Sequence, residues 1–112
     1  MGLPALTEAD FQRSVIELAQ RLGWLVAHFR PAQVGGRWQT AVQGDGAGFP
    51  DLCMVRGERL ILAELKAEKG RIRPEQRKWL DALQVVHDAP VSCVESYVWR
   101  PSDWDRIVEV LR

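Results

Sequence analysis

Residues 48–66 have the sequence GFPDLCMVRGERLILAELK. Its apolar runs over 51–55 and 60–65 predict two β-strands, and Gly57-Glu58 between them predicts a tight two-residue turn. In a hairpin with that turn, the numbers of paired residues sum to 115. Asp51 then lies directly across from Glu64, at the end of the hairpin away from the turn.

The Asp51 and Glu64 pair has a chemical consequence. Side chains paired in this way have Cβ atoms about 4.5–5.5 Å apart, so the two carboxylates repel each other unless a cation lies between them. Oxygen ligands of this kind suit Mg²⁺ or Mn²⁺. Lys66 shares a strand face with Glu64 and can position a water or stabilise developing phosphate charge. The alternative is that these side chains form an ordinary solvated strand face.

The elements outside the hairpin follow from hydrophobic periodicity and from cap residues. The predicted elements are a helix from Thr7 to about Leu22, a strand over 24–29, a long loop over 30–48, a helix from Pro74, a strand over 92–99 and a last helix capped by Ser102. Their order is α-β-β-β-α-β-α. We therefore expect an α/β protein, a single domain spanning residues 1–112, in which helices flank a mixed β-sheet.

The bulk composition limits the classes of function. Lys+Arg and Asp+Glu number 15 each, so a DNA-binding surface has to come from local charge segregation. No apolar run approaches the roughly 20 residues of a membrane span, and the N-terminus lacks the basic region of a signal peptide. Cys53 and Cys93 lack metal-ligand spacing and are expected to be reduced core residues. These features predict a cytoplasmic protein without membrane contact, in a bacterium or in the host of a phage that encodes it.

Three motifs follow one another along the chain: Gly48-Phe49-Pro50-Asp51, then Glu64-Leu65-Lys66, then Pro74-Glu75-Gln76. Their combination and spacing resemble the VRR-NUC branch of the PD-(D/E)XK nuclease superfamily, and the resemblance extends over nearly the whole chain. It implies a restriction-endonuclease-like fold and a divalent-metal phosphodiesterase. It also implies metal ligands at Asp51, Glu64 and the main-chain carbonyl of Leu65, with Lys66 as the catalytic lysine.

The resemblance also implies a further carboxylate from the first helix, for which the candidates are Glu8 and Glu17. Glu8 leads the apolar stripe that the helix turns inward, whereas Glu17 falls among arginines on the exposed side. We therefore assign Glu8 to the metal site. Whether Glu8 or Gln12, one turn later, completes that site stays open, as does a role for Glu8 in favourable interaction with the helix dipole alone.

Two further polar residues lie close to the predicted site. Gln76 falls on the inward face of the second helix, where a polar group needs a partner. The family resemblance places Gln76 beside the catalytic residues, and a hydrogen bond to the backbone is the alternative. His28 ends the strand over 24–29, and we interpret it as a satisfied strand histidine rather than a catalytic one.

A local basic stretch follows the Glu64-Leu65-Lys66 motif. It comprises Lys66, Lys69, Arg71, Arg73, Arg77 and Lys78, and the glycine-rich loop adds Arg30, Arg37 and the aromatic Trp38. Beside a metal site these residues predict contacts to DNA phosphates, although a solvated helix face is the ordinary role of such side chains.

The sequence therefore predicts a Mg²⁺- or Mn²⁺-dependent DNA endonuclease. Small members of this superfamily resemble Holliday-junction resolvases, which implies branched DNA as substrate and a homodimer, since cutting two strands symmetrically needs two related sites. Five tryptophans, more than a core of this size needs, favour such an interface. The alternatives are a non-catalytic nucleic-acid-binding module and a sequence-specific restriction-type endonuclease.

Overall fold

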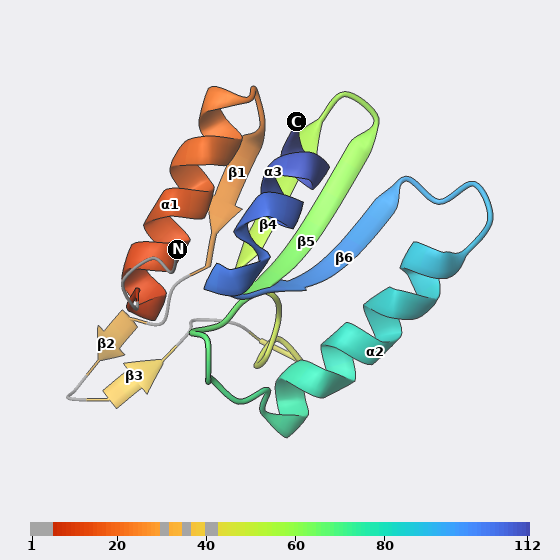
Figure 1. Cartoon of the computed structure of the whole chain (residues 1–112). Helices are drawn as coiled ribbons and strands as arrows, with labels where there is room; N and C mark the ends of the chain where they lie inside the picture. Colours follow the sequence, from red (N-terminus) through yellow and green to blue (C-terminus); the bar gives the residue numbers. More distant parts are fainter. Residues whose placement is uncertain (1–5, 30–31, 35–36, 40–42) are drawn as a thin grey trace.

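A computed structural model describes residues 6–29, 32–34, 37–39 and 43–112, and for 32–34 and 37–39 it describes the backbone only. The elements in chain order are α1 (Glu8–Arg21), β1 (Leu25–His28), β2 (Ala32–Val34), β3 (Arg37–Gln39), β4 (Leu52–Arg56), β5 (Arg59–Leu65), α2 (Pro74–Asp88), β6 (Val94–Trp99), the 3₁₀ turn η1 (Pro101–Asp103) and α3 (Trp104–Leu111). Figure 1 shows their arrangement in space.

The main sheet has four strands in the order β1-β4-β5-β6. The β1–β4 and β4–β5 pairs are antiparallel, whereas β5 and β6 are parallel and connected through α2. Leu52 pairs with Ala63 and Arg56 with Arg59, so the predicted register, in which paired numbers sum to 115, is confirmed. The α/β class is confirmed as well, and so is the order α-β-β-β-α-β-α for the four strands of this sheet and the three α-helices.

The two faces of the sheet are covered by different helices (Figure 1). Alternate residues of a strand point to opposite faces. Ile61, Ala63 and Leu65 join the core beneath α1 and α3, together with Phe11 and Ile107. The other face, which carries Leu62 and Glu64, meets α2 over β5 and β6. No helix in the described part of the chain is long and apolar enough to cross a membrane.

Three predictions about local structure were wrong. The segment predicted as one long loop contains a small antiparallel sheet of β2 and β3. Gly35-Gly36 lies between these two strands in the sequence, and such a pair between short runs is a hairpin signal. Ser102 is not the cap of the last helix, because Pro101 begins a 3₁₀ turn and Asp103 precedes α3. Cys93 is exposed rather than in the core, while Cys53 is half-buried; neither forms a disulfide.

Candidate active site

Asp51 and Glu64 meet at the end of the β4–β5 hairpin that the register predicts. Asp51 directly precedes β4, and its Oδ2 accepts a hydrogen bond of 2.8 Å from the main-chain N–H of Leu65. This bond holds the Asp51 carboxyl against the end of β5. Glu64 is 1% exposed, so the sheet and α2 enclose a carboxyl group that has another carboxyl as its neighbour.

The surroundings of Glu64 satisfy only part of its hydrogen-bonding capacity. Gln76 Nε2 donates to Glu64 Oε1 at 3.1 Å. Glu64 Oε2 is buried and has no hydrogen-bond partner among the residues that the structure describes. Burial first, and then the adjacent Asp51, raise the pKa of Glu64 to about 9. At neutral pH this site therefore requires either a proton or a cation.

Gln76 is held in position from the other side. It is 6% exposed, and its Oε1 accepts a hydrogen bond of 2.9 Å from the main-chain N–H of Arg73, at the start of α2. Because the amide oxygen is engaged there, the amide NH₂ turns toward Glu64. A backbone partner and a place beside the Asp51 and Glu64 carboxyl groups, which the sequence offered as alternatives for Gln76, thus occur together.

The Gly48-Phe49-Pro50 segment anchors Asp51 against α2. Gly48 has φ +85°, and a Cβ built there would lie 2.5 Å from the main-chain carbon and oxygen of Glu75. Only glycine fits this close approach without displacing the backbone. Phe49 then packs edge-to-face against Phe29, with ring centres 5.6 Å apart, and against Trp79, at 5.0 Å. The loop before Asp51 is therefore fixed by contacts to β1 and α2.

Lys66 lies directly after β5 and is 8% exposed. Its main-chain N–H donates to the carbonyl of Trp99 at 3.0 Å, which continues the β5–β6 pairing one residue beyond the strand. The positive charge of Lys66 lowers the pKa of Glu64, but burial raises that pKa by more. The structure thus brings Asp51, Glu64, Lys66 and Gln76 together.

Glu8 is the more distant carboxylate. It is exposed in the first turn of α1, and its charge is one of the causes that raise the pKa of Glu64. Within the described residues, no three or more His, Cys, Asp or Glu side chains converge as a ligand cluster. The protein would therefore contribute Asp51, Glu64 and the Leu65 carbonyl, and the remaining positions would be filled by water. That donor set, with the unpartnered Glu64 Oε2, fits Mg²⁺, which keeps several waters in protein sites.

Comparison with known families gives a match over most of the chain. A sequence model of the VRR-NUC domain matches residues 10–96. The chain belongs to the VRR-NUC family. This is a nuclease domain of the PD-(D/E)XK type, as the three motifs predicted. The matched segment of this VRR-NUC chain includes Asp51, Glu64, Lys66 and Gln76 and begins two residues after Glu8. Searches among curated proteins and among solved structures returned no match.

The basic stretch of the VRR-NUC domain runs from the end of β5 into the first turns of α2. Its members beyond Lys66 are all exposed: Lys69, Arg71, Arg73, Arg77 and Lys78. Arg73 pairs with Glu75 at 3.4 Å, and Arg77 pairs with Asp81 at 3.8 Å. Ion pairs between exposed side chains such as these contribute little to the stability of the fold. Arg30 lies outside the described residues, and so does the side chain of Arg37.

Arg100 is a structural residue that sequence reasoning missed. Its Nη1 donates to the carbonyls of Ala67, Glu68 and Gly70, at 2.8, 3.2 and 2.8 Å. The main-chain N–H of Ser102 donates to the Glu68 carboxylate at 3.0 Å. These bonds hold the loop that carries the basic stretch. Arg100 lies about 30 residues further along the chain, and no local pattern indicates this contact.

Proposed function

We propose that this VRR-NUC chain is a divalent-metal-dependent DNA endonuclease that cuts branched DNA as a homodimer, in the manner of a Holliday-junction resolvase. The observation that carries the proposal is the buried Glu64 carboxyl group next to the half-buried Asp51, with Lys66 beside it and with no hydrogen-bond partner for Glu64 Oε2 among the described residues. A buried carboxylate next to a second carboxyl group destabilises the folded protein. Such a pair is best explained by a cation that it binds.

The chain's own residues have distinct roles in this proposal. Mg²⁺ or Mn²⁺ held by Asp51, Glu64 and the Leu65 carbonyl would lower the pKa of a bound water and polarise the scissile phosphate, and Glu8 would act on the site through its charge. Gln76 keeps Glu64 in one orientation through its hydrogen bond. Lys66 positions the attacking water or stabilises the charge that develops on the phosphate.

The basic stretch would hold the DNA backbone next to these groups. Phosphate contacts by Lys and Arg supply much of the affinity of proteins for DNA, without reading sequence. We assign this role to the exposed cations of the loop and of α2, namely Lys69, Arg71, Arg73, Arg77 and Lys78, and also to Arg30 and Arg37. Of the described members of this group, none is among the charges that shift the pKa of Glu64, whereas Lys66 is.

The homodimer is supported by an exposed apolar surface. Leu25 is 77% exposed and Val55 is 40% exposed, and the two are paired across β1 and β4. Both side chains lie on the same face of the sheet as α2, but over β1 and β4, which α2 does not cover. A second copy over this face would remove both side chains from water. Two of the five tryptophans, Trp24 and Trp99, lie in the core, so the number of tryptophans does not itself indicate an interface.

The proposal is tested by digesting a four-way junction, a flap, single-stranded DNA and plain duplex in Mg²⁺, Mn²⁺ or EDTA. We expect cleavage in Mg²⁺ and Mn²⁺ that EDTA abolishes, and we expect the junction to be cut faster than the duplex. Asp51→Asn, which preserves the size of the side chain, should be inactive. Metal-independent DNA binding without cleavage of any substrate would instead identify a non-catalytic module.

A further inference from the structure

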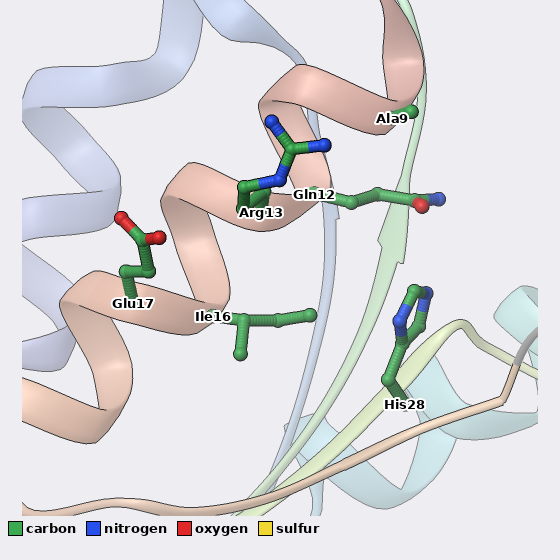
Figure 2. Close-up of a pocket in the computed structure, with 6 residues that line it drawn as sticks. All are labelled: Ala9, Gln12, Arg13, Ile16, Glu17 and His28. Carbon is green, nitrogen blue, oxygen red and sulfur yellow. The ribbon is translucent and has the colours of Figure 1, made fainter.

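Phe29 is a large apolar side chain that is 41% exposed at the end of β1. Its main-chain N–H donates to the Asp51 carbonyl at 2.8 Å, which extends the β1–β4 pairing by one residue beyond His28. Figure 2 shows the His28 side chain turned toward α1. Because successive side chains of a strand alternate between the two faces, Phe29 takes the opposite face, which carries Asp51 and Glu64.

A row of three side chains therefore crosses this face at one end of the sheet. Phe29 lies opposite Asp51, and Asp51 lies opposite Glu64 in the register of β4 and β5. Neighbours in such a row have Cβ atoms about 5 Å apart. Exposure rises along the row, from the buried Glu64 through the half-buried Asp51 to the exposed Phe29. The least covered side of the two carboxyl groups is thus the side on which Phe29 lies.

The ring of Phe29 is held in place by two further aromatic rings. Phe49 packs edge-to-face against Phe29, with ring centres 5.6 Å apart, and also edge-to-face against Trp79 at 5.0 Å. Trp79 Nε1 donates to the carbonyl of Asp45 at 2.7 Å, which anchors the far end of this series. An exposed ring that its neighbours already hold is pre-organised to receive a second flat ring, because little side-chain freedom is lost on binding.

An exposed aromatic ring beside a phosphodiester-cleaving site suits a nucleobase. Bases stack on aromatic side chains whatever their sequence, because every base has a π-face. A base inside a duplex has both faces covered by its neighbours, whereas a base at a branch point, in a flap or in a single strand has a free face. The basic stretch begins where β5 ends, at the same end of the sheet as Phe29, and could hold the backbone of the same strand (Figure 1).

We propose that Phe29 stacks on a nucleobase with one free face, adjacent to the scissile phosphodiester of the strand being cut. The inference rests on the proposed nuclease function and specifies its substrate. Phe29 is then a specificity-determining residue, because it stabilises only DNA whose base at the cut site has lost a stacking neighbour. Leu25 and Val55, the apolar pair assigned to the dimer, are separate from this contact, since Leu25 lies about 13 Å further back along β1.

The test uses an oligonucleotide substrate that the wild-type chain cuts at a mapped position. Single abasic nucleotides are placed in turn at each position around the cut, and the affinity for each DNA is measured in Ca²⁺. We expect the wild type to lose about tenfold in affinity at one position next to the cut, the size of one base–aromatic stack. Phe29→Leu keeps an apolar side chain but removes the ring. It should bind the intact substrate about tenfold more weakly and show no further loss at that position.

Phe29→Trp is the matched variant, because it offers a larger ring for stacking. It should increase the abasic penalty, and it covers the case in which Phe29→Leu fails to fold. A flat abasic profile in the wild type, or a penalty that is unchanged in the variants that fold, would overturn the stacking role and leave the nuclease proposal standing. If Phe29→Leu keeps the penalty and only changes the oligomeric state in sedimentation, Phe29 belongs to the dimer interface instead.

A different result would remove both proposals. If the folded wild type cuts no substrate in Mg²⁺ or Mn²⁺, the nuclease proposal fails and the stacking role fails with it.

Discussion

At the scale of single residues, Glu64 is a carboxyl group placed where an isolated carboxylate is unstable. Burial and Asp51 raise its pKa to about 9, compared with about 4.5 for an exposed glutamate. The metal-free folded protein therefore holds a proton that the unfolded chain releases as the pH rises above 4.5. The stability linked to this proton is fully present below pH 4.5 and is lost progressively up to about pH 9.

This linkage predicts how metal-free protein responds to pH. In EDTA, the free energy of unfolding of the wild type should fall with rising pH by up to about 1.4 kcal/mol per pH unit more than that of Glu64→Gln. Urea unfolding at pH 5, 6, 7, 8 and 9 measures both proteins. Glu64→Gln removes the titrating group and retains a similar shape. Parallel pH profiles of the two proteins would show that Glu64 does not hold this proton.

Lys66 should affect chemistry rather than binding. It lies beside Glu64, and positioned general acid–base or electrostatic groups typically contribute about 100-fold or more in rate. Lys66→Ala should lower the single-turnover cleavage rate by about that factor at saturating DNA while leaving affinity in Ca²⁺ nearly intact. Lys69→Ala is the matched control, which should weaken binding and flatten its salt dependence by about one phosphate contact. Normal cleavage by Lys66→Ala at saturating DNA would show that Lys66 is only a phosphate contact.

At the scale of elements, the loop before β4 and the start of α2 form one unit through Gly48. Gly48 and Gly44 both have positive φ, +85° and +63°, so alanine at either position costs about 1–2 kcal/mol in backbone strain. A Cβ meets nothing within 4 Å at Gly44 but meets the Glu75 backbone at Gly48. Gly48→Ala should therefore lower the free energy of unfolding by about 1–3 kcal/mol more than Gly44→Ala does, as measured by urea unfolding. Equal losses would contradict the close approach to α2.

The elements also show what sequence can and cannot predict. The β4–β5 register was predictable because a two-residue turn determines all the pairs of a hairpin, and hence the meeting of Asp51 and Glu64. The partner of Gln76 and the contacts of Arg100 were not, because each depends on segments that meet only in the folded chain. The β2–β3 pair was missed because its strands are only three residues long and carry no clear hydrophobic alternation.

At the scale of the whole molecule, the exposed β1 edge should be where two copies meet. Leu25→Lys would place a charge in the proposed interface, and we expect sedimentation analysis to show a monomer where the wild type is a dimer. The monomer should nick a four-way junction rather than cut both strands together. Val91→Lys is the control, because Val91 is fully exposed in the turn before β6. A wild-type monomer at all concentrations, or a dimeric Leu25→Lys protein, would contradict this interface.

Asp51 and Glu64 are proposed to bind the metal that cleavage requires, and a calorimetric titration with Mn²⁺ measures that binding. Wild-type protein should bind Mn²⁺, whereas Asp51→Asn and Glu64→Gln should show no measurable binding, because each removes one of the two adjacent carboxylates. Glu8→Gln should weaken binding more than Glu17→Gln, since only Glu8 acts electrostatically on Glu64. Undiminished Mn²⁺ binding by both Asp51→Asn and Glu64→Gln would show that these two carboxylates do not form the metal site.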